Sequence, residues 1–84
     1  MTLNEAAQIV AQKKGEVLAI VQWPYDEFLF TVCVQIADEE WVVWTFNSQT
    51  SGCSNGSYFT RKEDALRQFG DRCPFVIRSN PRAY

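Results

Sequence analysis

The sequence predicts an α+β domain in which an antiparallel β-meander sheet carries two helices packed mainly on one face. Three observations support this prediction. Capping-box patterns open two helical segments, period-two alternation marks three strand segments between residues 16 and 47, and only short turns separate those segments. The expected order of elements is α-β-β-β-β-α-β. Residues 1–84 should form one domain, because a chain of this length has room for one hydrophobic core.

The first helix is predicted over residues 3–14. Thr2 and Glu5 have the spacing of a capping box. In this motif the hydroxyl accepts a hydrogen bond from the backbone N–H of the glutamate, and the carboxylate accepts one from the backbone N–H of the threonine. Small apolar residues recur at helical spacing from Leu3 to Val10, and Gly15 can end the helix. The narrow stripe of small residues indicates close packing against a sheet.

Three strands are predicted next, over residues 16–23, 28–36 and 41–47. Each is rich in β-branched and aromatic residues and alternates side chains between two faces. The connections are short, with turn residues at 24–27 and acidic residues at 37–40. Such short loops favour antiparallel hairpins.

The remainder of the sequence, from residue 47 onward, predicts a polar loop, a brief strand, a helix and a final strand. Residues 47–57 are almost all small and polar, and Tyr58-Phe59 forms the brief strand. A second capping box, Thr60 to Glu63, is expected to open a helix of about nine residues. The final strand is expected at residues 75–77, and residues 79–84 as a loose tail.

Both faces of the predicted sheet carry apolar side chains. Two short helices on one face would leave the apolar side chains of the other face uncovered. Monomers seldom expose large apolar patches, and Trp and Tyr dominate binding hot spots. We therefore expect a non-catalytic adaptor, inhibitor or regulatory subunit that binds a protein partner, or a second copy of itself, through the sheet. The other possibility is that the helices divide between the faces or the tail folds back, which leaves nothing uncovered. The expected contacts are four aromatic anchors and an acidic rim: Trp23, Tyr25, Trp41 and Trp44, and Asp38, Glu39 and Glu40.

The net charge of −2 hides an asymmetry along the chain. Residues 1–60 carry two lysines against seven acids, and residues 61–84 carry six bases against three acids. The alternative function is therefore nucleic-acid association through this basic segment, although a pI near 4.9 argues against it. The bases are Arg61, Lys62, Arg67, Arg72, Arg78 and Arg82.

The chain contains no histidine, which excludes Ser-His-Asp triads, Cys-His dyads and imidazole metal sites. Three cysteines without a C-x-x-C pair do not make a zinc site, and the acidic turn lacks the ligand spacing of an EF-hand. We expect no metal, no cofactor and no enzymatic activity. A third hypothesis is a redox or thiol enzyme that uses Cys53, which the pattern places in a polar loop.

The composition indicates a cytoplasmic protein that does not enter a membrane. No apolar run exceeds five residues, and the first fourteen residues lack the charged and apolar regions of a signal peptide. An odd number of cysteines is also unusual for a small secreted domain.

Overall fold

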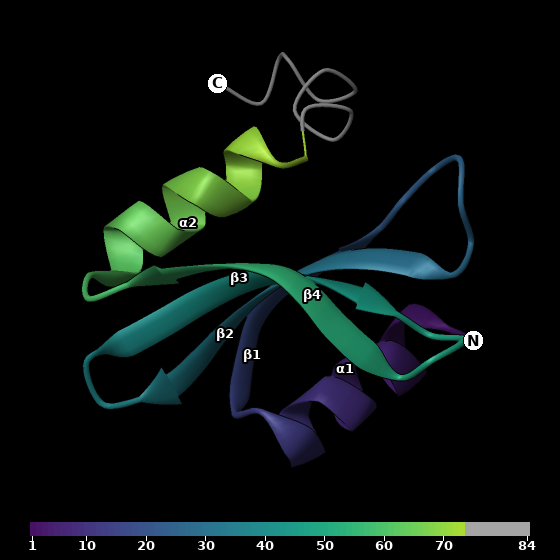
Figure 1. The fold of residues 1–84 in the computed structure, drawn as a ribbon, viewed down its shortest axis with the longest axis horizontal. Coiled ribbons are helices and arrows are strands. Elements are labelled where there is room, and N and C mark those ends of the chain that lie inside the picture. Colours follow the sequence, from purple (N-terminus) through teal and green to yellow (C-terminus); the bar gives the residue numbers. More distant parts are fainter. Residues whose placement is uncertain (74–84) are drawn as a thin grey trace.

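A computed structural model of the chain describes residues 1–73 (Figure 1). Four antiparallel strands form one sheet in chain order, so the predicted α+β class and the meander are confirmed. The expected strand at 75–77 and the tail at 79–84 lie outside the described residues. The elements in order are α1 (Leu3–Lys13), β1 (Glu16–Gln22), β2 (Leu29–Ala37), β3 (Glu40–Asn47), β4 (Gly52–Phe59) and α2 (Lys62–Asp71).

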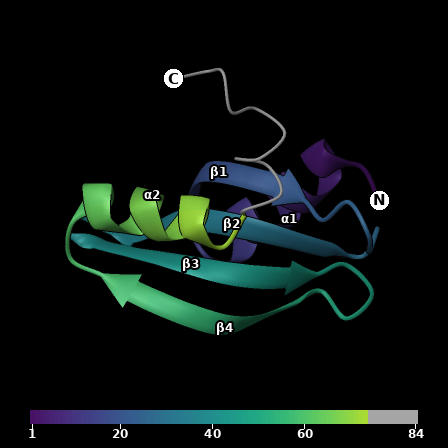
Figure 2. The same ribbon diagram turned by 90° about the horizontal axis from the view of Figure 1, so that it is seen from above.

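The two helices lie on opposite faces of the sheet (Figures 1 and 2), so the prediction that both pack mainly on one face is wrong. Val10 of α1 belongs to the core on one side, and Ala65 of α2 belongs to the core on the other. The cause lies in the two central strands, where residues 30–34 of β2 and 42–46 of β3 are all buried. Because consecutive strand residues point to opposite faces, both faces need a cover.

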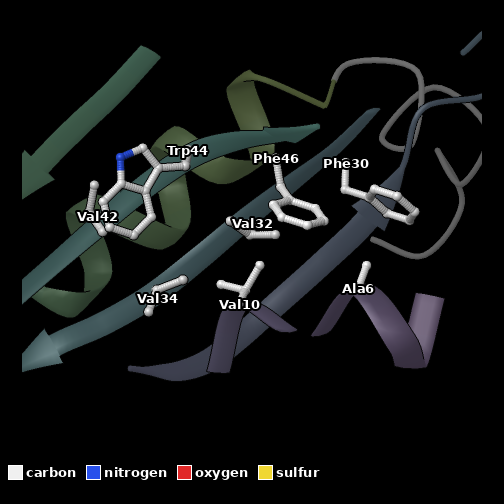
Figure 3. Packing of buried hydrophobic residues seen from close by; sticks show 8 residues of the cluster. All are labelled: Ala6, Val10, Phe30, Val32, Val34, Val42, Trp44 and Phe46. Carbon is white, nitrogen blue, oxygen red and sulfur yellow. The ribbon is translucent and has the colours of Figure 1, made fainter. Parts of the chain in front are cut away.

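The larger core lies between α1 and the sheet (Figure 3). Ala6 and Val10 are small enough to let the helix approach the strands closely, and the rings of Phe30 and Phe46 pack with centroids 6.1 Å apart. The eight buried residues of this core are Ala6, Val10, Phe30, Val32, Val34, Val42, Trp44 and Phe46.

The predicted capping box of α1 is confirmed. The backbone N–H of Thr2 donates to the Glu5 carboxylate at 2.7 Å, and the Glu5 N–H donates to the Thr2 hydroxyl at 3.2 Å. After the helix, Gly15 has a φ of +147° and lies against the Gln35 carbonyl, so a side chain there would collide with β2. The glycine therefore allows the chain to turn directly from α1 into β1.

The predicted polar loop at 47–57 is wrong, because most of it forms β4. Only residues 48–51 make the turn, in which the Asn47 side chain accepts a hydrogen bond from the Gln49 N–H at 2.9 Å. An edge strand can be held by backbone pairing alone, so its exposed side chains need not be apolar. A β-bulge interrupts the pairing with β3 near Asn55, whose φ is +56°.

The second predicted capping box is also wrong. Arg61, in an extended conformation, is the N-cap of α2 and makes no side-chain capping bond. The helix therefore begins one residue later than the Thr60 hydroxyl would require. Within residues 1–73, neither helix is long and apolar enough to cross a membrane.

Candidate protein-interaction surface

The residues predicted to bind a partner are divided between the two ends of the sheet. Trp23 and Tyr25 belong to the β1–β2 connection, whereas Asp38 and Glu39 form the β2–β3 turn and Glu40 begins β3. The nine residues of β2 separate these turns by about 30 Å, at roughly 3.3 Å per residue. The predicted set is therefore not one continuous surface.

The β1–β2 connection carries one exposed and one anchored aromatic side chain. Tyr25 is 95% exposed. Trp23 is half-buried, and its indole N–H donates to the Thr31 hydroxyl at 3.0 Å. A shallow hollow runs along residues 22–27. Tyr25 is thus available to a partner, while part of Trp23 has a structural role.

The two tryptophans of β3 point to opposite faces, as the alternation predicts, but neither is a freely exposed anchor. Trp44 is only 8% exposed and belongs to the core on the α1 side. Trp41 is half-buried beside Phe59 on the α2 side. Its indole nitrogen is buried and has no hydrogen-bond partner among the described residues. The imbalance noticed in the sequence is therefore largely resolved by a helix on each face.

Tyr58, which sequence reasoning did not assign to partner binding, is 59% exposed. It pairs with Val42 across β3 and β4, and its ring meets that of Trp44 edge-on, with centroids 6.2 Å apart and planes at 87°. Tyr58 and Phe59 are adjacent in a strand, so they must face opposite sides. Phe59 packs towards α2, which leaves Tyr58 facing outward on the α1 side.

Two acids of the predicted rim lie beside this tyrosine. Glu39 and Glu40 line a shallow hollow together with Tyr58, Phe59 and Thr60. Asp38 is exposed on the same turn but does not line the hollow; its carbonyl accepts a hydrogen bond from the Gln35 side chain at 3.1 Å. We call Glu39, Glu40, Tyr58 and the adjoining ring of Trp44 the Tyr58 surface.

The described part of the basic segment, residues 61–73, does not present a free row of cations. Arg72 donates hydrogen bonds to the carbonyls of Val43 and Asn55, at 2.8 and 2.7 Å, and to the Thr45 hydroxyl at 2.9 Å. Arg61 and Arg67 lie near acids of their own helix, 4.0 Å from Glu63 and 3.5 Å from Asp64. Lys62 is exposed, and Arg78 and Arg82 lie outside the described residues. The arrangement gives little support to phosphate binding by this segment.

The thiol of Cys53 is not arranged as a nucleophile. Cys53 lies half-buried in β4 rather than in a loop, and burial raises its thiol pKa more than Lys14 and Lys13 lower it. Cys33 and Cys73 are buried and free, and burial likewise raises the pKa of each. Reactive thiols need a lowered pKa. Within residues 1–73, no three potential metal ligands come together.

No protein-family model matches the chain, and searches of curated proteins and of solved structures give no significant match either.

Proposed function

We propose that this protein is a non-catalytic interaction module of the cytoplasm, an adaptor, inhibitor or regulatory subunit, that binds a protein partner through the Tyr58 surface. The observation that carries the proposal is the position of Tyr58. It is a largely exposed aromatic side chain. Its ring packs edge-on against that of Trp44, and it shares a hollow with Glu39 and Glu40. An aromatic anchor beside charged residues is the usual composition of a binding hot spot with a polar rim.

Electrostatics support the same surface. The three acids at and beside the β2–β3 turn lie at one end of the sheet, and residues 1–60 as a whole carry a net charge of −5. Such a field speeds the encounter with a basic partner and fixes its orientation more than it adds affinity. A partner with a basic contact patch therefore fits this end of the molecule.

A second copy of the chain is the other protein partner that the fold supports. In the described part of the chain, β1 and β4 are the edges of the sheet, and the five central residues of β1 are all partly exposed. Open strand edges can pair with another chain. Sedimentation velocity over a range of concentrations distinguishes self-association from binding of a different protein.

The test of the proposal is affinity capture from native lysate, after nuclease treatment, with wild-type protein and two tyrosine variants. Tyr58→Ala should weaken capture of a specific protein by about 2 kcal/mol or more, the range of hot-spot truncations. Tyr25→Ala, which removes an even more exposed tyrosine at the other end of the sheet, is the matched control and should bind normally. Equal capture by wild type and Tyr58→Ala would disprove the assignment of this surface.

A further inference from the structure

The ammonium group of Lys14, the residue that caps the C-terminal end of α1, lies over the indole ring of Trp44. Its Nζ is 5.3 Å from the ring centroid, within the range of a cation–π interaction. Neither of the two ion pairs found among residues 1–73 includes Lys14. The aromatic ring is therefore the partner that the described structure gives this cation.

The surroundings of the ring are suited to hold a cation. Trp44 lies at the opposite end of the α1-side core from Ala6 (Figure 3), and Tyr58 stands at a right angle to it. Gly56 keeps β4 close to the ring, since a Cβ there would lie 2.6 Å from the indole nitrogen. Two aromatic rings set at a large angle form the walls with which proteins bind ammonium groups.

Charges nearby favour a cation approaching from the side of Tyr58. Glu39 and Glu40 share a hollow with Tyr58, so negative charge lies beside the tyrosine and attracts a cation to that side of the two rings. On the other side, Lys13 and Lys14 both act on the Cys53 thiol, which places positive charge near the first half of β4. Because the Lys14 ammonium group already lies over the Trp44 ring, another cationic group can bind there only if Lys14 moves away.

We propose that Trp44 and Tyr58 bind a lysine or arginine side chain of the protein partner, and that Lys14 occupies this position when the partner is absent. The inference rests on the proposed function and adds to it the chemistry of the recognised residue. Lys14 is exposed on a long, flexible side chain, so its ammonium group can leave the ring for solvent without disturbing the core. Its departure uncovers the face of Trp44, and the incoming cation replaces it.

An internal competitor has a measurable consequence. An exposed cation–π contact is worth roughly 0.5–1 kcal/mol, which corresponds to about a two- to fivefold change in affinity. Lys14→Ala should therefore bind a cationic ligand about two to five times more tightly than the wild type. Lys13→Ala is the matched control, because it removes the same charge from the neighbouring position, and it should change affinity less.

The experiment titrates the full-length protein with capped pentapeptides, Gly-Ser-Lys-Ser-Gly and its arginine and norleucine counterparts, and follows the indole N–H resonance of Trp44 by NMR. The lysine and arginine peptides should shift this resonance saturably, and norleucine, which keeps the length without the charge, should not. Tyr58→Ala should weaken binding at least about threefold, while the dispersion of its spectrum reports whether the fold is intact. Absence of any shift with Lys14→Ala, or an equal response to norleucine, overturns the inference.

The two proposals fail in different ways. If Tyr58→Ala abolishes capture of the partner while the peptides leave Trp44 unaffected, the interaction surface stands and cation recognition is wrong. If Tyr58→Ala captures the partner normally, the proposed function at this surface is wrong, and the inference falls with it.

Discussion

The guanidinium group of Arg72 donates a hydrogen bond to the hydroxyl of Thr45, which ties the end of α2 to the centre of the sheet. The same guanidinium donates to the carbonyls of Val43 in β3 and Asn55 in β4, at the β-bulge between these two strands. A bulge leaves backbone groups that the neighbouring strand cannot pair. Arg72 donates to two carbonyls at this bulge and so stabilises the stretch of β4 that departs from regular pairing with β3.

Replacing Arg72 by alanine should therefore destabilise the fold. Three hydrogen bonds from a charged group would be lost, two of them to backbone carbonyls, so we expect the free energy of unfolding to fall by about 3 kcal/mol. Urea unfolding at neutral pH measures this change. Arg67→Ala, which breaks an exposed pair with Asp64, is the control and should cost about 0.5 kcal/mol or less. Similar losses for the two variants would contradict the role given to Arg72.

The contact between Gly56 and Trp44 leads to a second prediction. In Gly56→Ala the new Cβ would lie 2.6 Å from the indole nitrogen and 2.9 Å from Cδ1 of Trp44. Because Trp44 is part of the core, the ring cannot retreat freely, and we expect a loss of about 1–3 kcal/mol together with a changed near-ultraviolet circular dichroism spectrum.

Gly52→Ala is the control for this substitution. Its Cβ would meet only the Thr50 hydroxyl, at 3.3 Å, on the exposed turn before β4. The expected change is within about 0.5 kcal/mol. If Gly56→Ala is as stable as Gly52→Ala, the strand and the indole are less tightly packed than the structure indicates.

Local signals in the sequence were sufficient for α1 and for the two central strands. The capping box at Thr2 depends on residues three apart, and the alternation in β2 and β3 depends on residues two apart. In β1 a bulge after Val17 breaks the alternation, so Leu18 and Ala19 both pack on the α2 side. No local pattern marks that irregularity.

The features that the sequence did not reveal depend on contacts between distant residues. Strand β4 contains glycine, serine and asparagine, which have low strand propensity, and forms because β3 offers it backbone partners. In the sequence nothing distinguishes Arg72 from a solvent-exposed base. In the structure three acceptors at and near the bulge surround its guanidinium group. Of the candidate site, Glu39 and Glu40 were predicted as part of an acidic rim and Trp44 as an aromatic anchor. The exposure of Tyr58 follows from the register of β4.

Stability should depend on pH through Glu5. The backbone N–H of Thr2, and then its hydroxyl, stabilise the Glu5 carboxylate and lower its pKa below the ordinary value of 4.5. Since the pKa is lower in the folded state, this contribution is fully present above the unfolded value and is lost as the pH falls through the folded value. Glu5→Gln can keep the capping bond without titrating. The free energy of unfolding of the wild type, measured with urea relative to that of Glu5→Gln, should therefore fall between neutral pH and pH 3. The same difference between the two proteins at both pH values would contradict this prediction.

The three thiols should react slowly and in a fixed order. Burial raises the pKa of each, so little thiolate is present at neutral pH, and the thiolate is the reactive species. Cys53 is half-buried near the edge of the sheet, whereas Cys33 and Cys73 are 0% and 1% exposed and require an opening of the fold.

Labelling with iodoacetamide at pH 7.5, followed by mass spectrometry of the peptides, measures the three rates. Cys53 should react first but more slowly than a free cysteine peptide, and Cys33 and Cys73 should react only after Cys53 unless urea is present. Raising the pH should speed the reaction of Cys53, since more of the thiol is then ionised. A rate for Cys53 above that of the free peptide would mean that its thiolate is stabilised by its surroundings, and the hypothesis of a thiol enzyme would then displace that of a non-catalytic interaction module.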